Sequence, residues 1–126
     1  MMTFEINGVI LPFDATDADT LDKYLRATEA CAEKSRSMED PGTDRKKVVQ
    51  MYRDICQSVK TVFDDIFGAG TGEKVCGKND SANQCREAYA ALMKEYNRQQ
   101  EEAQKANEEF QKLFGDKETD QEPDKK

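Results

Sequence analysis

The stretch VVQMYRDICQSVKTVFDDIF at residues 48–67 decides the fold. Its apolar side chains recur at alternating steps of four and three residues, which places them on one face of an α-helix. A second apolar row runs beside the first and widens this face, so the predicted helix belongs at the centre of a core. The two rows are Val48, Tyr52, Ile55, Val59, Val62 and Ile66, and Val49, Cys56, Phe63 and Phe67.

Glycines follow this helix. Gly68 suits a left-handed helix C-cap, and the segment 69–77 predicts a compact connector that holds one short helical turn. The same glycines beside Lys74 suggest a phosphate-binding loop, but such a loop needs Gly-Lys-Ser/Thr after a strand. Here Glu73 separates glycine from lysine and a helix comes before, so we interpret the segment as a turn.

The chain before the helices predicts a small β-hairpin at residues 3–13. Apolar residues alternate weakly there, and Asn7-Gly8 lies between the two halves, which is the strongest short signal for a hairpin turn. Because a two-stranded hairpin is marginal alone, we expect it to pack on the helices. The apolar positions are Phe4, Ile6, Val9 and Leu11.

A first helix is predicted from about Asp17 to about Ser37. Thr16 and Asp19 have the spacing of a capping box at the start of this helix. After the helix, Pro41-Gly42 breaks helical structure and predicts that the chain turns there. One face of this helix is apolar at steps of three and four, which predicts a single packing stripe. The stripe is Leu21, Tyr24, Leu25, Thr28, Cys31 and Ala32.

A long C-terminal helix is predicted to begin near Asp80-Ser81 and to run for about 34 residues, or roughly 50 Å. Its apolar register is strong to Tyr96 and weak at 99–106, where nothing large is available to bury. We therefore expect the second half to project beyond the body, with Phe110, Leu113 and Phe114 at its tip. These three side chains fit either a terminal core contact or a partner-binding patch.

The predicted fold class is thus mainly α, with an N-terminal β-hairpin, three helices, a short helical turn between the second and third, and a long C-terminal helix. A length of 126 residues fits one domain, which we place at residues 1–115. The tail at 116–126 is charged and contains a proline, and is predicted to be disordered.

Composition argues against catalysis and against several kinds of site. The chain has no His, and its four Cys lack metal-type spacing, so we predict no enzyme, no metal site and no cofactor. Asp17 opens a run of acids, but a calcium loop would need Gly and Glu where Asp22 and Thr28 stand. The thiols are expected to stay free, and Asp64-Asp65 to be solvated.

Charge and hydropathy narrow the range of partners. A net charge of -7 disfavours direct binding to nucleic acid or to an anionic membrane. No window approaches the roughly 18 consecutive apolar residues of a membrane span, and the first residues lack the pattern of a signal peptide. We therefore expect a cytoplasmic protein.

Two groups of motifs resemble a family of short, uncharacterised proteins from bacteriophages and prophages of Gram-positive, often clostridial, bacteria. The first group is Ile6-Asn-Gly-Val9 with Pro12-Phe-Asp14 and Asp17-Ala-Asp19. The second runs from Val62-Phe-Asp-Asp-Ile-Phe-Gly68 through Gly72-Glu-Lys-Val-Cys-Gly77 to Cys85 and Ala88-Tyr89. The resemblance covers roughly residues 3–96, and the chain after Gln99 departs from it.

Members of that family tend to lie among late virion-assembly genes, in a position typical of tail assembly chaperones. The resemblance implies a non-enzymatic interaction protein in the host bacterial cytoplasm, with a phage tape-measure or tail-tube protein as partner. Self-association through the long C-terminal helix is a further expectation. The alternatives are an inhibitor of a host defence system that mimics nucleic acid through its acids, and a minor virion structural subunit. Phe110, Leu113 and Phe114 are the predicted partner-binding residues.

Overall fold

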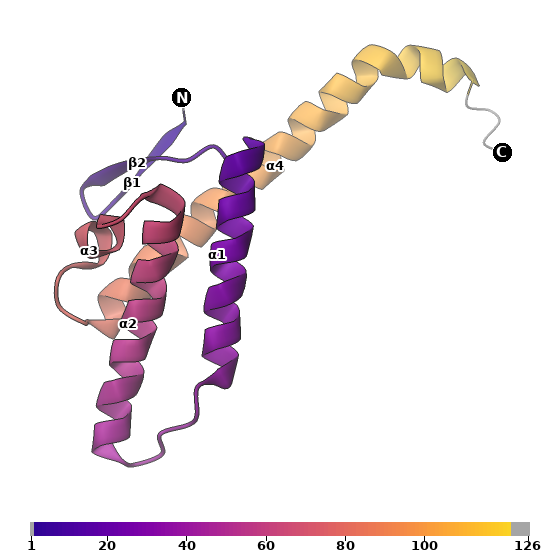
Figure 1. Cartoon of the computed structure of the whole chain (residues 1–126). Coiled ribbons are helices and arrows are strands. Elements are labelled where there is room, and N and C mark those ends of the chain that lie inside the picture. The colour runs from indigo at the N-terminus through magenta and orange to yellow at the C-terminus, as the bar shows by residue number, and fades with distance from the viewer. Residues whose placement is uncertain (1, 122–126) are drawn as a thin grey trace.

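A computed structural model describes the backbone of residues 2–121 and the side chains of residues 2–114. It confirms a mainly helical chain with an N-terminal hairpin and a long C-terminal helix (Figure 1). No described helix is both long and apolar enough to cross a membrane. The elements in order are β1 (Thr3–Ile6), β2 (Val9–Pro12), α1 (Ala18–Ser37), α2 (Arg45–Phe67), α3 (Thr71–Cys76) and α4 (Ala82–Gln121).

The hairpin is antiparallel, and its register pairs Ile6 with Val9 across the Asn7-Gly8 turn. Asn7 and Gly8 have φ values of 49° and 83°, as a two-residue hairpin turn requires. Its inner face is buried on the helices through Ile6 and Leu11. The Asn7 side chain also donates a hydrogen bond of 2.6 Å to the carbonyl of Val75, which ties the turn to α3.

The core is built around the second half of α2. Cys56, Val59, Val62, Phe63 and Ile66 are buried there, as the sequence predicts. The first half of the predicted face is different, because Val49 and Tyr52 are 50% and 42% exposed. The reason is that α4 begins beside the second half and runs away from the first, as Figure 1 shows.

The start and the buried face of α1 differ from the prediction. Asp17 is the N-cap and accepts a hydrogen bond of 3.0 Å from the Thr20 backbone N–H, whereas Thr16 donates to Asp14. The predicted Thr16 capping box is therefore wrong. Leu25 is exposed, whereas the small Ala27 is buried. The buried face of α1 is therefore rotated about the helix axis relative to the predicted stripe.

The glycine connector contains α3, as predicted. Gly72 is buried against α2, where a Cβ atom would collide with the backbone of Lys60. Its N–H donates a hydrogen bond of 2.8 Å to the Asp64 carboxylate. Asp64 therefore positions the connector, although the sequence suggested only a solvated acid.

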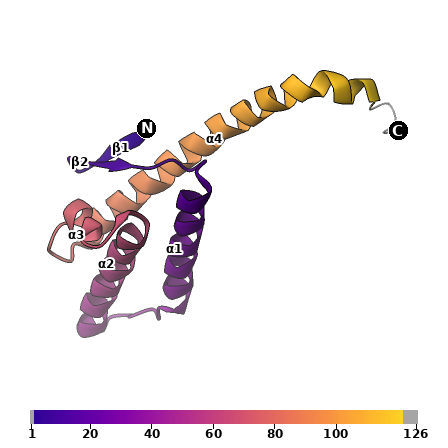
Figure 2. The ribbon, with the colours of Figure 1, turned by 45° about the horizontal axis from the view of Figure 1, so that its top comes forward.

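The helix α4 begins after Ser81, whose hydroxyl accepts a hydrogen bond from the Gln84 backbone N–H. Its second half extends away from the other elements (Figure 2). The backbone stays helical to Gln121, so the helix does not end near Gly115, where the predicted domain ends. An isolated glycine costs a helix only about 1 kcal/mol relative to alanine, which does not by itself end a helix. Of the tail predicted to be disordered, 116–121 is helical and 122–126 lies outside the described residues.

Gln99 is buried at the point where α4 leaves the body, with 1% of its surface exposed. Its Oε1 accepts a hydrogen bond of 2.7 Å from the Ala15 N–H. Its Nε2 donates bonds of 2.8 Å to the Phe13 carbonyl and 2.7 Å to the Glu95 carboxylate. One side-chain amide thus holds the backbone that links the hairpin to α1. Sequence periodicity placed Gln99 in a stretch with nothing large to bury, and so missed this contact.

Replacing Gln99 with Leu should lower the free energy of unfolding by about 3 kcal/mol, because the substitution leaves the backbone groups of Phe13 and Ala15 buried without partners. Urea unfolding followed by circular dichroism measures the change. Gln104→Leu is the matched control on an exposed site of the same helix, with an expected change within about 0.5 kcal/mol. Equal effects of the two substitutions would contradict this role for Gln99.

Candidate interaction surfaces

The predicted partner-binding residues lie at the projecting end of α4. Phe110, Leu113 and Phe114 are 58%, 75% and 49% exposed, so they are not a terminal core contact. The two phenylalanine rings meet edge to face with centroids 5.0 Å apart. We call these three side chains the tip. It is a compact apolar cluster on a helical segment that is otherwise polar and exposed.

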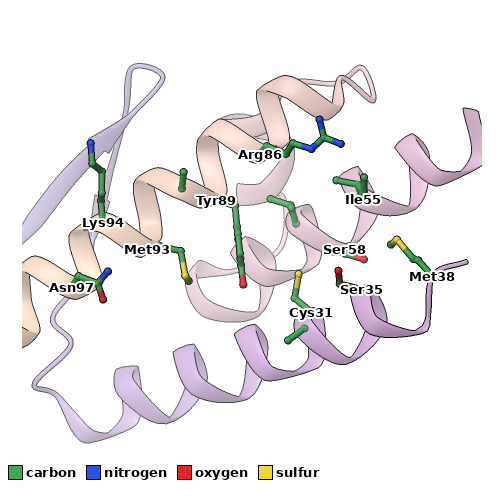
Figure 3. A pocket seen from close by; sticks show the side chains of 13 residues that line it. Cys31, Ser35, Met38, Ile55, Ser58, Arg86, Tyr89, Met93, Lys94 and Asn97 are labelled. Carbon is green, nitrogen blue, oxygen red and sulfur yellow. The ribbon is translucent and has the colours of Figure 1, made fainter. Parts of the chain in front are cut away.

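A second surface is an apolar groove between α1, α2 and α4 with a volume of about 640 Å³. In Figure 3, α1 forms one wall, α4 forms the other and α2 lies between them. The lining residues are Cys31, Ala32, Ser35, Met38, Ile55, Ser58, Val59, Arg86, Tyr89, Ala90, Met93, Lys94 and Asn97. The sequence did not predict this groove.

The groove is mostly apolar, and the Lys94 amine on α4 points away from it in Figure 3. The Tyr89 ring and the Met93 thioether extend from α4 toward α1, as Figure 3 shows. Arg86 and Lys94 are its only charged lining residues, and none of the described residues that line it is Asp or Glu. The groove is therefore suited to an apolar group.

One polar atom in the groove is buried without a partner. Among the described residues, only the Ser58 hydroxyl oxygen is a buried side-chain polar atom with no hydrogen bond. Ser58 lies on α2 and lines the groove. An occupant that brings a polar group to this point would satisfy it, since leaving such an atom unpaired is costly.

Tyrosines fill the end of the groove near the start of α1. Tyr24 stacks on Tyr96 with ring centroids 4.2 Å apart, and its hydroxyl donates to the Met93 sulfur at 3.6 Å. Burial raises the pKa of Tyr89 to about 12, and Cys31 beside it adds to the shift. Burial likewise raises the pKa of Cys31. Tyr89 and Cys31 are therefore neutral at physiological pH.

The cysteines are all free thiols. Cys56, Cys76 and Cys85 are fully buried together in the core, whereas Cys31 is half-buried at the groove. Burial is the main cause that raises the pKa of Cys56 to about 12, and it also raises the pKa values of Cys76 and Cys85. Among the described residues, no three His, Cys, Asp or Glu side chains are placed to hold a metal ion.

The acidic residues that the sequence singled out near α1 serve local structure. Asp14 accepts hydrogen bonds from the hydroxyl and the N–H of Thr16, which lower the pKa of its carboxyl. Asp17 caps α1. These acids thus have roles in folding that need no bound cation.

The fold and these surfaces define a small helical protein with an N-terminal hairpin, an exposed apolar tip and an apolar groove. A protein-family model, the family of unknown function DUF6673, matches residues 7–126. The match spans nearly the whole chain, so the protein belongs to the DUF6673 family. Comparison with curated proteins and with solved structures gives no match.

A signal for the groove does exist in the sequence. The face of α1 that lines it carries only small side chains at Cys31, Ala32 and Ser35. Three small residues at helical spacing cannot fill the space opposite Tyr89 and Met93, so a hollow follows. Periodicity alone treated Cys31 and Ala32 as ordinary packing positions.

Burial predicts a large difference in thiol reactivity. Because the thiolate is the reactive form, Cys31 should react with a thiol reagent in mildly alkaline buffer at least about tenfold faster than the buried thiols. Labelling followed by peptide mass spectrometry measures the four rates. Cys31→Ser should remove the fast phase, and denaturant should make all four sites reactive. Fast labelling of Cys56 in the native protein would contradict the packing described.

Proposed function

We propose that this protein is a non-enzymatic bacteriophage or prophage protein that acts by binding another protein, most specifically as a tail assembly chaperone-like factor. The observation that carries the proposal is the exposed tip at the end of a projecting helix. Its members stand at i, i+3 and i+4, which is the spacing of anchors that insert into an apolar groove on a partner. The motif resemblance of residues 3–96 supports the same conclusion.

The client suggested by this chemistry is a protein with long apolar helical stretches, such as a tape-measure protein, or a tail-tube subunit. A chaperone of such a client must cover apolar surface and remain dispersed until assembly. The tip offers aromatic anchors of the kind that contribute most at protein interfaces. The net charge of -7 favours the solubility of the chain and of its complexes.

The charge distribution gives less support to a nucleic-acid mimic. Where α4 leaves the body, Arg98 bridges Glu95 at 2.7 Å and Glu102 at 3.0 Å. Beyond it, Lys105 stands between the acid pairs Glu101-Glu102 and Glu108-Glu109 and Lys112 follows them, so the acids do not form an uninterrupted row of negative charge. We propose no enzymatic role.

The proposal is tested by capturing the tagged protein from phage-producing cells before lysis. The wild type should recover the tape-measure or tail-tube protein, and Phe110→Ser/Leu113→Ser/Phe114→Ser should recover at least about tenfold less, because aromatic anchors dominate binding. Bound proteins are identified and quantified by mass spectrometry. The melting temperature of the variant should match that of the wild type, since all three side chains are exposed.

Ile10→Ser/Leu25→Ser/Val49→Ser is the matched control, because these three apolar side chains are also exposed but lie elsewhere. This control should capture the client as the wild type does. Recovery of a host defence protein instead of a tail protein would overturn the proposal in favour of an inhibitor. Presence of the chain in purified virions would overturn it in favour of a structural subunit.

A further inference from the structure

We propose that Asn7 is a site of spontaneous chemical modification, at which the side-chain amide is lost as ammonia and the hairpin turn is released from α3. The residues that carry the proposal are Asn7 and Gly8 of the turn and Val75 of α3. The inference goes beyond the proposed function and does not rest on it, because it concerns the chain alone.

This deamidation needs only the chain and water. The backbone nitrogen of Gly8 loses its proton and attacks the side-chain carbon Cγ of Asn7, which forms a C–N bond and closes a cyclic imide. The bond from Cγ to the side-chain nitrogen breaks, and that nitrogen takes up a proton and leaves as ammonia. Water then opens the ring at either carbonyl and leaves aspartate or isoaspartate at position 7. No group is oxidised or reduced, so no further reactant is required.

The first argument is the access of the attacking nitrogen. A side chain on the residue after an asparagine crowds this nitrogen, and glycine has none. Gly8 has a φ of 83° and is exposed, and apart from its chain neighbours no atom lies within 4 Å of the position that a Cβ would occupy. The ladder ends at the pair of Ile6 with Val9, so Gly8 lies outside it. The turn therefore leaves the nitrogen open to reaction.

The other asparagines of the chain lack this access. Each is followed by a residue with a polar or charged side chain, and three of them lie in α4, where helical hydrogen bonds hold the backbone nitrogens. They are Asn79, Asn83, Asn97 and Asn107. Asn7 is therefore set apart by the residue that follows it and by its place in an exposed turn.

The second argument is the contact that the amide makes before it is lost. Its Nδ2 donates the hydrogen bond of 2.6 Å to the carbonyl of Val75. Val75 is buried in the last turn of α3, and the final carbonyls of a helix have no partner within that helix. The Asn7 amide thus supplies the donor that this carbonyl needs. In Figure 1 the turn of the hairpin lies beside α3.

Loss of the amide turns this contact from favourable to unfavourable. Aspartate places a carboxylate, which only accepts hydrogen bonds, against a carbonyl, which also only accepts. Isoaspartate in addition routes the backbone through the side chain and adds a carbon atom to the turn. Because the turn fixes the register of a hairpin, this product also disturbs the strand pairing. Both products therefore weaken the docking of the turn on α3.

The first test is incubation of the purified full-length chain at mildly alkaline pH, followed by peptide mass spectrometry. Asn7 should convert at least about tenfold faster than any other asparagine of the folded chain, because glycine leaves the attacking nitrogen uncrowded. The rate should rise with pH, since this nitrogen must lose its proton. Gly8→Asp is the matched control: aspartate tolerates the left-handed backbone but crowds the nitrogen, so Asn7 should convert slowly. A folded wild type in which Asn7 converts no faster than the other asparagines would overturn the proposal.

The second test is the effect of the product on the hairpin. Asn7→Asp makes one product directly, and because Asp-Gly suits the same turn as Asn-Gly, the variant removes the donor and keeps the turn. Hydrogen exchange at the N–H groups of the hairpin ladder should become at least about fivefold faster, as expected for a buried carbonyl left without a partner. The converted fraction of the incubated wild type should show the same faster exchange.

Asn107→Asp is the control for charge, because it makes the same change on an exposed residue of α4. Its hairpin exchange should stay within about twofold of the wild type, as for other substitutions on an exposed surface. Circular dichroism checks that both variants are folded. Unchanged hairpin exchange in Asn7→Asp, or equal acceleration in both variants, would overturn the release of the turn from α3.

Discussion

The amide of Gln99 is the contact on which the arrangement of the chain depends. It satisfies the backbone of Phe13 and Ala15, so the segment between the hairpin and α1 is fixed to α4. The hairpin and α1 approach the body from this segment, and their positions over α3 and beside α2 follow from it. The amide also marks where α4 changes from a core helix to a projecting one. Without it, a buried stretch of backbone would lack partners, which folded proteins avoid.

Local structure was largely predictable from the sequence, because it depends on short-range chemistry. The Asn7-Gly8 turn, the buried second half of α2 and the glycine connector all follow from residue type and spacing. The errors occurred where distant residues decide. Leu25 has the spacing of a core residue, yet it is exposed, whereas its neighbour Tyr24 is buried and stacks on Tyr96 of α4. Gln99 looked like a solvated residue, because its partners lie more than 80 positions away in the sequence.

The tip and the groove also differ in how far the sequence predicts them. The sequence singled out the three residues of the tip but left open whether they form a terminal core contact or an exposed patch, and the structure shows them exposed. The groove was not predicted, because it depends on what three helices leave unfilled. On α1, Cys31 and Ser35 have short side chains that leave space in the groove, whereas Tyr89 and Met93 extend into it from α4. The small residues of α1 are the one signal that the sequence carries, and the hollow itself depends on how the three helices pack.

The tyrosine cluster also has an optical consequence. The chain has no tryptophan and four tyrosines, so its ultraviolet emission comes from tyrosine alone. Tyr24, Tyr89 and Tyr96 all lie between α1 and α4, and Tyr89 lines the groove itself. Any molecule that enters there changes the surroundings of that ring. The protein thus carries an intrinsic fluorophore inside its own groove, and occupancy is readable in solution without a label.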